Sequence, residues 1–219
     1  MSQEETKKAP AKKKRRERPE VLFLKGTVFV NCLVPLAMLI FDWTRDRLGA
    51  NPIEFVTRTT GTLTLVFLLL TLAVTPAKRF FEAPLIARLR RMLGLFAFFY
   101  GTLHFLTYVA LDKFFSLKGI VEDVLGRYFI SIGMIAYFAM IMLALTSTDA
   151  SAKKLGGVRW RQIHKRIYWI APLGVLHYWL LVKADIAKPL IFAALTAVLL
   201  GIRAIHYLKP KLPVPVDSD

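Results

Sequence analysis

The sequence is poor in cysteine and in charged side chains. Cys32 is the one cysteine among 219 residues, so an intrachain disulfide, an iron–sulfur cluster held by this chain alone and a cysteine-rich zinc site are excluded. Charged residues make up 21% of the chain and hydrophobic residues 55%, a balance that leaves a soluble domain of this length short of polar surface. Any metal chemistry therefore depends on histidine, and the composition favours a membrane protein.

The apolar residues are gathered into long runs rather than spaced as in soluble helices. A span needs about 20 mainly apolar residues to cross roughly 30 Å of hydrocarbon. The two last candidates are short between their flanking basic residues, so they rely on those side chains reaching the interface. We predict an all-α integral membrane protein, a six-helix transmembrane bundle with five spans as the alternative, whose spans are residues 21–41, 57–75, 92–111, 128–146, 163–183 and 187–207.

The basic residues are distributed unevenly between the two sides of this bundle. The chain has 31 Lys and Arg against 15 Asp and Glu, a net charge of +16. In the six-span arrangement 23 of the basic residues fall on the side of the termini and eight on the other. Because basic loops resist translocation, both termini are predicted to be cytoplasmic. Membrane topology thus accounts for the charge, and no nucleic-acid partner is expected.

The chain divides into one membrane domain and two tails. Residues 1–20 are basic and cannot bury enough apolar surface to fold, so they are predicted to be a disordered cytoplasmic tail. Residues 21–207 are the membrane domain, and residues 208–219 a short C-terminal tail. The segment 21–41 is too long for a signal-peptide core and lacks a cleavage site. Gly156 and Gly157 lack the strand and helix of a dinucleotide-binding fingerprint, so no nicotinamide-binding site is predicted there.

Histidine is the informative residue type, because the chain has only four. His104 lies roughly 18 Å along the third span and His177 roughly 20 Å beyond His164, which opens the fifth. The two should be level toward the outer leaflet, where neutral imidazoles from neighbouring helices can fill both axial positions of a haem iron. The alternative is that each histidine only forms hydrogen bonds within the bundle. Residues that suit a flat apolar macrocycle lie nearby: Phe99, Tyr100, Gly101, Phe105, Gly174 and Tyr178.

A second haem near the cytoplasm has no obvious ligand pair. The residue fourteen positions before His104, on nearly the same helix face, is Arg90 rather than a histidine. His164 and His177 are about 140° apart on an ideal helix, unless Pro172 changes the twist. Three roles for His164 stay open: an axial ligand partnered by His206, a contact to a propionate or a flavin, or an interfacial residue.

Three segments carry a family resemblance: NPIEFVTRTTG, RRMLGLFAFFYGTLHFLTY and WRQIHKRIYWIAPLGVLHYWLLVKAD. They resemble the haem-b membrane subunits of bacterial periplasmic methionine sulfoxide reductase systems, a branch of the ferric reductase-like transmembrane group, which also contains the NADPH oxidases. The resemblance covers about residues 22–207. In the group, two helices with two histidines each hold two haems. His104, His164 and His177 match three of those positions and Arg90 takes the fourth, as in this branch, so the resemblance implies haem b on His104 and His177 and leaves a second haem on His164 open.

The resemblance also implies a flavin and redox partners. Flavin mononucleotide (FMN) is associated with the family, and basic residues at the cytoplasmic face could hold its phosphate, although positive-inside determinants are the commoner role; these residues are Arg79, Arg88, Arg90 and Arg91. The implied donor is quinol or a cytoplasmic flavin reductase. The implied acceptor is a periplasmic molybdopterin methionine sulfoxide reductase. The chain would then be a multi-pass electron-transfer subunit of the bacterial inner membrane, with the sulfoxide chemistry on a partner chain.

Two other functions compete with this one. A stand-alone ferric or quinone reductase of the same group would act without the molybdenum partner. A haem-free transporter or assembly factor would use its histidines only for packing, but the spans lack the paired broken-helix signals of transporters. Smaller expectations are a helical Glu54–Arg58 ion pair, solvated loop charges at Asp112, Glu122 and Asp123, and a packed Cys32.

Overall fold

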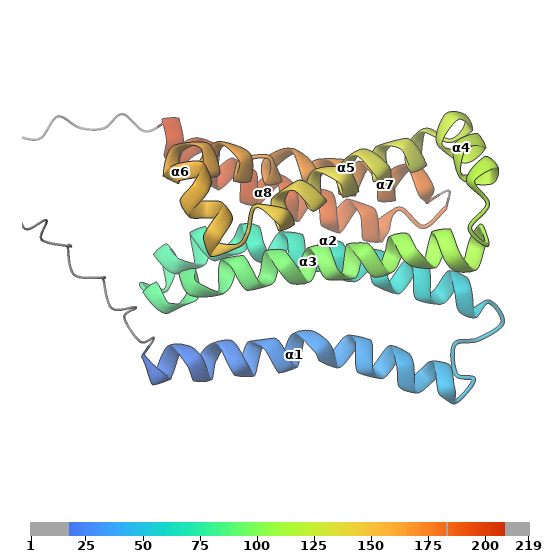
Figure 1. The fold of residues 1–219 in the computed structure, drawn as a ribbon, viewed down its shortest axis with the longest axis horizontal. Coiled ribbons are helices and arrows are strands. Elements are labelled where there is room, and N and C mark those ends of the chain that lie inside the picture. The colour runs from blue at the N-terminus through green and yellow to red at the C-terminus, as the bar shows by residue number, and fades with distance from the viewer. Residues whose placement is uncertain (1–17, 183, 209–219) are drawn as a thin grey trace, which may run out of the picture.

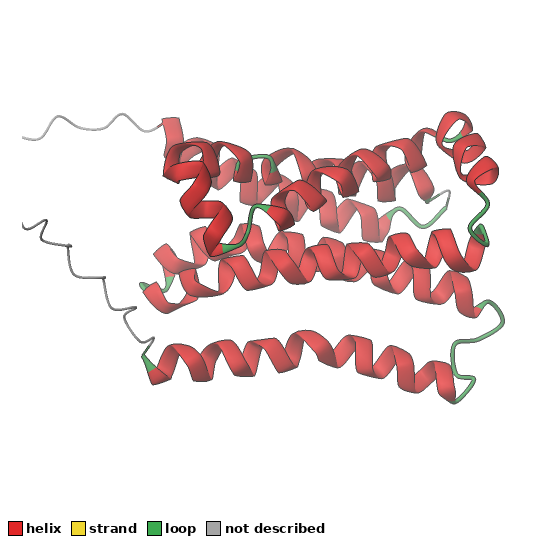
Figure 2. Cartoon of the chain, in the orientation of Figure 1, coloured by secondary structure: helices red, strands yellow, loops and turns green. Residues whose placement is uncertain are grey.

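The computed structural model describes residues 18–182 and 184–208, and these residues form helices without any strand (Figure 2). The all-α prediction is therefore confirmed, while residues 1–17 and 209–219 of the predicted tails lie outside the described part. The longer elements are α1 (Pro19–Thr44), α2 (Pro52–Phe80), α3 (Arg90–Leu106), α5 (Tyr128–Leu145), α7 (Ile167–Leu181) and α8 (Ala187–Leu208). Between them lie the 3-10 helix η1 (Pro84–Leu89), the π-helix η2 (Thr107–Asp112), α4 (Leu117–Gly126) and α6 (Asp149–His164).

Local sequence signals explain several helix starts. The Asn51 side chain accepts a hydrogen bond from the Glu54 amide, and Pro52 follows at the first helical position of α2. The Ser116 and Thr148 side chains cap α4 and α6 in the same way. The predicted ion pair between Glu54 and Arg58 is present at 2.6 Å.

The long helices α1, α2, α3, α5, α7 and α8 run along one axis, and α4 sits at one end of the bundle (Figure 1). The start of α1 and the end of α8 both lie at the opposite end, on different sides of the bundle. That both termini share one side of the membrane, and that this side is the cytoplasm, stay predictions.

Among the described residues, five helices are long and apolar enough to cross a membrane: α1, α2, the continuous stretch Pro84–Asp112, α5 and α8. The chain is thus a multi-pass membrane protein. Helix α7 has only 15 residues, so the count of six spans stays a prediction.

The predicted fifth span, 163–183, is wrong at its start. The residues between the predicted fourth and fifth spans, 147–162, instead form most of α6, and the chain turns at Lys165 and Arg166 before α7 begins. His164 therefore ends α6 rather than opening a span. Pro172 lies within α7 and does not mark the break.

Helix α2 lies at the centre of the bundle and packs on α3, α7 and α8. Tyr100 of α3 is completely buried, stacks on Phe67 with ring centroids 5.2 Å apart, and donates a hydrogen bond to the Cys32 carbonyl of α1 at 2.7 Å. Cys32 is buried there, as predicted. The outer surfaces of α1 and α5 expose large apolar side chains such as Phe23 and Phe138, as expected where the solvent is lipid.

Pro76 in α2 leads to a side-chain contact that joins α8 to α2. Pro76 has no N–H, so the carbonyl group of Leu72 loses its helical donor. Arg203 of α8 supplies a donor instead, because its Nη2 lies 2.5 Å from the Leu72 oxygen and 2.9 Å from Thr75 Oγ1. Satisfying a freed carbonyl in this way is required in a membrane, where water is scarce. Arg203 thereby fastens α8 to α2.

Replacing Arg203 should therefore cost stability in a way that depends on Pro76. We expect Arg203→Met to lower the free energy of unfolding by on the order of 2 kcal/mol, since it leaves a carbonyl unpaired. In a Pro76→Ala background, whose restored N–H satisfies Leu72, the same change should cost clearly less. A double-mutant cycle measured by denaturant unfolding in detergent checks this. Equal losses in the two backgrounds would contradict the assignment.

Candidate functional site

His104 of α3 and His177 of α7 face each other inside the bundle. Their ring centroids are 6.0 Å apart and their planes are inclined by 79°. The prediction that the two lie level is confirmed. Two imidazoles that share one metal ion, with bonds of about 2 Å on either side, hold their ring centres roughly this far apart.

Each imidazole is oriented by a main-chain carbonyl group of the adjacent helix. His104 Nδ1 lies 2.9 Å from the Thr57 oxygen of α2, and His177 Nδ1 lies 2.6 Å from the Phe129 oxygen of α5. A carbonyl oxygen only accepts, so both Nδ1 atoms carry the proton. Each Nε2 then has its lone pair free for a metal, the usual arrangement of metal-binding histidines.

Two glycines make these contacts sterically accessible. Gly61 and Gly133 lie four residues after Thr57 and Phe129, and a helical side chain covers the turn that precedes it. A Cβ atom on Gly61 would be 3.0 Å from His104 Nδ1, and one on Gly133 would be 2.8 Å from His177 Nδ1. Any larger residue would push the imidazole off its carbonyl. The sequence analysis missed both glycines, because they are marked only by their spacing from two carbonyl groups that have no sequence signature.

The histidine pair lies in a cavity of about 320 Å³, within the usual size range of small-molecule sites. Four of the residues predicted to flank a macrocycle line it: Gly101, Phe105, Gly174 and Tyr178. Phe99 and Tyr100 do not, and that part of the prediction is wrong. At 100° per residue Phe99 faces away from the side of α3 that carries His104 and Phe105, and Tyr100 turns into the core against α1 and α2.

The end of the cavity nearest α4 is polar. Arg58, Tyr108, Asp112 and Arg127 line it. Arg58 is paired with Glu54. Cationic side chains at the mouth of an otherwise apolar cavity suit a flat apolar molecule with acidic groups at one edge.

Asp123 joins α4 to this polar end. The carboxylate contacts Lys113 Nζ at 2.5 Å, the Tyr108 hydroxyl at 3.0 Å and Arg127 Nε at 3.4 Å, and the residue is only 8% exposed. The expectation of a solvated loop charge is wrong for Asp123, because α4 folds it back onto the bundle. Burial raises the pKa of Asp123, but the hydrogen bonds from Lys113 and Tyr108 and the charge of Arg127 outweigh it and lower the pKa below its ordinary value.

His164 and Arg90 lie away from the histidine pair. His164 Nδ1 is 3.1 Å from the Trp160 oxygen, Nε2 is 3.3 Å from Ser147 Oγ, and the ring stacks on Trp160 at 3.9 Å. Burial and the charge of Arg91 lower the pKa of His164, against the effect of the Trp160 carbonyl. The side chain of His206 is not among those described. Arg90 Nη2 instead contacts Thr75 Oγ1 at 2.8 Å.

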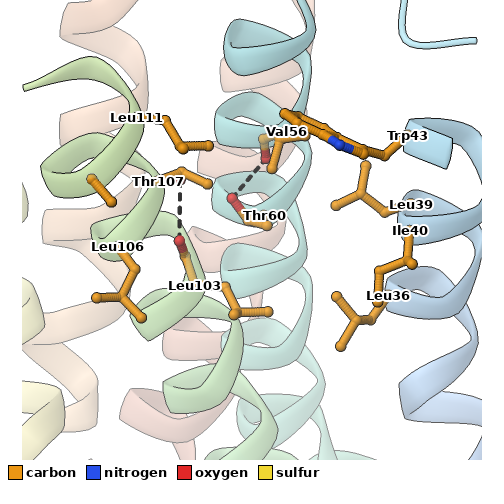
Figure 3. Close-up of a pocket in the computed structure, with 11 residues that line it drawn as sticks. Leu36, Leu39, Ile40, Trp43, Val56, Thr60, Leu103, Leu106, Thr107 and Leu111 are labelled. Atoms are coloured by element: carbon orange, nitrogen blue, oxygen red, sulfur yellow. Dashed lines mark hydrogen bonds between the residues drawn. The ribbon is translucent and has the colours of Figure 1, made fainter. Parts of the chain in front are cut away.

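A second cavity, of about 340 Å³, lies between α1 and the α2–α3 pair (Figure 3). Its lining is apolar apart from the Thr60 and Thr107 hydroxyls, which donate to carbonyls one turn earlier, and the indole of Trp43 at its edge. Within the described residues no group of three or more His, Cys, Asp and Glu could hold a metal ion.

Comparison with known proteins agrees with this architecture. Residues 60–175 match the family model of the ferric reductase like transmembrane component. A protein of Herminiimonas arsenicoxydans is 47% identical over 84% of this chain and 86% of its own length, and one of Ralstonia nicotianae is 49% identical over 80% and 82%. A protein of Caulobacter vibrioides is 42% identical over 87% and 91%. All three are named protein-methionine-sulfoxide reductase heme-binding subunit MsrQ.

The interactions of Asp123 should make the free energy of unfolding depend on pH. Because the pKa of Asp123 is depressed in the folded state, its contribution is present above the ordinary aspartate pKa of about 3.9 and is lost as the pH falls through the lower folded value. We expect Asp123→Asn to cost on the order of 2 kcal/mol at neutral pH. The difference between the wild-type and variant unfolding free energies should shrink below about pH 4. A difference that is constant with pH would contradict this account; Glu122→Gln is the control, since Glu122 is exposed.

Proposed function

This chain belongs to the ferric reductase-like transmembrane family, and from that premise we propose that it is the haem-b membrane subunit of a methionine sulfoxide reductase system. In this proposal the imidazoles of His104 and His177 would hold the haem iron. The chain carries electrons through the membrane, and the sulfoxide is reduced on a partner chain.

The observation that supports the proposal is the double contact between imidazole and carbonyl. His104 and His177 are both fixed through Nδ1 to another helix, and their rings are 6.0 Å apart. Packing alone does not explain why both histidines are hydrogen-bonded through Nδ1 and face each other with Nε2 unused. The carbonyl partners also raise the basicity of the imidazoles as ligands.

The surrounding residues fit a haem. Glycines and apolar side chains leave room for a flat macrocycle, and Arg58 and Arg127 at the polar end of the cavity are suited to its propionates. A bound haem supplies a one-electron ferric/ferrous couple. Reducing one sulfoxide to a thioether and water takes two electrons and two protons, so two successive deliveries are needed. The chain's own part is to orient the ligands and keep water away from them.

The electron donor, the flavin cofactor and the electron acceptor in this proposal are those that the family resemblance implies. Electrons come from quinol or a cytoplasmic flavin reductase, FMN is a further cofactor, and the acceptor is a periplasmic molybdopterin methionine sulfoxide reductase. The protein is placed in the bacterial inner membrane with its basic termini in the cytoplasm. A second haem on His164 is not part of the proposal, because both its ring nitrogens already have hydrogen-bonding partners.

A stand-alone ferric or quinone reductase is the main alternative. It would use the same histidine pair but need no molybdenum partner. A neighbouring gene for a secreted molybdopterin protein favours the proposed system, and its absence favours the alternative.

The histidine pair is tested by a reduced-minus-oxidised absorbance spectrum of the purified protein. We expect b-type bands in the wild type and in His164→Ala, and their loss in His104→Ala and His177→Ala, since one imidazole cannot complete the site. A haem-to-protein ratio that falls by about half in His164→Ala would instead establish a second haem. If wild type produced with ample haem has no such bands, the chain is haem-free and the proposal fails.

The two glycines provide an independent test. Gly133→Ala should displace His177, where the added Cβ would be 2.8 Å from Nδ1, and Gly61→Ala should displace His104 to a lesser degree. We expect both variants to fold but to retain less haem, with altered bands. Gly201→Ala and Gly26→Ala are matched controls, because a Cβ at either position has open space. Equal haem content in all four variants would show that the carbonyl contacts do not hold the ligands.

A further inference from the structure

Helix α4 connects the ends of two helices that are long and apolar enough to cross a membrane. The stretch Pro84–Asp112 ends four residues before α4 begins, and Arg127 alone separates α4 from the start of α5. Figure 1 shows α4 at this end of the bundle, beside α5 (Figure 1). The ends of neighbouring spans lie at the surface of the membrane, so α4 lies close to the boundary between lipid and water.

One side of α4 packs on the bundle. Asp123 is buried on this side by the three partners described above. Ile120 and Val124 are partly buried beside it, and the Val124 carbonyl accepts a hydrogen bond from the Ser131 hydroxyl of α5. These contacts fix the rotation of α4 about its own axis and therefore determine which residues face outward.

The outward side of α4 is divided into an apolar and a charged stripe. At 100° per residue, the apolar stripe of Leu117, Val121 and Leu125 lies within an arc of about 80°. Its side chains are 78%, 55% and 79% exposed. The charged stripe follows around the helix and consists of Lys118 and Glu122, which are exposed and 3.9 Å apart. An apolar stripe beside a charged one is the pattern of a helix that lies in the membrane interface, with one stripe in lipid and the other in water.

The apolar stripe leads directly to the lipid-facing surface of α5. Leu125 lies three residues before Tyr128, which is exposed at the start of α5. Ile135 and Phe138 are exposed further along the same helix, where the solvent is lipid. A tyrosine at the end of a span is typical of the boundary between lipid and water. We therefore expect the same lipid leaflet to cover both surfaces.

The turn before α4 adds two exposed aromatic side chains. Phe114 and Phe115 both have left-handed backbone conformations, with φ of 46° and 59°, which are strained for residues other than glycine. Their side chains are 78% and 68% exposed. In water nothing would offset this strain, whereas in the membrane interface the two rings leave water and the apolar transfer offsets it.

We propose that α4 binds the membrane surface as an interfacial helix, with its apolar stripe in the lipid and its charged stripe in water. The buried side of α4 then holds Tyr108 and Arg127, through Asp123, at the depth of the lipid headgroups. These two residues also line the polar end of the histidine cavity. A soluble protein fits this surface less well, because transient protein interfaces are no more apolar than ordinary protein surface. The proposal does not depend on a bound haem.

Nitroxide labelling of the full-length protein in liposomes of phosphatidylcholine and phosphatidylglycerol tests this proposal. Val121→Cys and Leu125→Cys place a label on the apolar stripe, and Lys118→Cys and Glu122→Cys are matched controls on the charged stripe. Wild type is the labelling control, because Cys32 is buried. Power-saturation EPR measures the collisions of each label with oxygen, which concentrates in lipid, and with a nickel complex that stays in water.

We expect the ratio of oxygen to nickel collisions to be about 5-fold or more higher on the apolar stripe, because an interfacial helix buries that side roughly 5–10 Å deep. Equal ratios at the four positions, or water-like ratios on the apolar stripe, would overturn the proposal. A stripe that binds a soluble protein would give the water-like result, since these liposomes contain no partner. All four residues are exposed, so the variants should fold. Leu117→Cys replaces an apolar-stripe variant whose thermal unfolding midpoint departs from that of the wild type. A haem spectrum of the same samples reports separately on the histidine pair.

Discussion

The contact between an imidazole N–H and the backbone of a neighbouring helix is the interaction on which this site depends. It fixes the tautomer, points Nε2 at the opposite histidine and requires a residue without a side chain one turn later. Those requirements in turn bring α3 close to α2 and α7 close to α5, the two most extensive helix contacts in the bundle. The histidine pair is thus the point at which two tightly packed helix pairs meet.

At the end of the bundle opposite α4, a different backbone group needs a hydrogen-bonding partner. Pro76 removes one N–H from α2, and Arg203 answers with a charged donor rather than a neutral one. A hydroxyl could have satisfied the same carbonyl without adding charge. The Arg203 guanidinium has more donors than the Leu72 carbonyl needs, and Arg90 contacts the same Thr75 hydroxyl. Satisfying the carbonyl with an arginine therefore also concentrates positive charge at that end.

Hydropathy and charge counts were sufficient to predict the helical membrane fold and most helix positions, because long apolar runs are a strong signal. Helical arithmetic also predicted that His104 and His177 would be level. The sequence analysis failed at α6 and His164, since a short polar helix leaves no hydropathy signal. It also failed at Asp123, whose burial depends on how α4 folds back. The carbonyl partners Thr57 and Phe129 were equally beyond prediction, because main-chain acceptors carry no residue signature.

Helix α3 joins the two ends, with Arg90 at its start and His104 fourteen residues later, roughly 21 Å along the axis. A guanidinium has no lone pair to give a metal and stays protonated, so Arg90 cannot ligate an iron. What it can offer is hydrogen-bond donors. One of those donors contacts the Thr75 hydroxyl of α2, so Arg90 fastens the start of α3 to α2, while His104 further along the same helix is fastened to α2 through the Thr57 carbonyl. Helix α3 is thus held to α2 by a side chain near each of its ends, and this fixes the depth at which His104 meets His177.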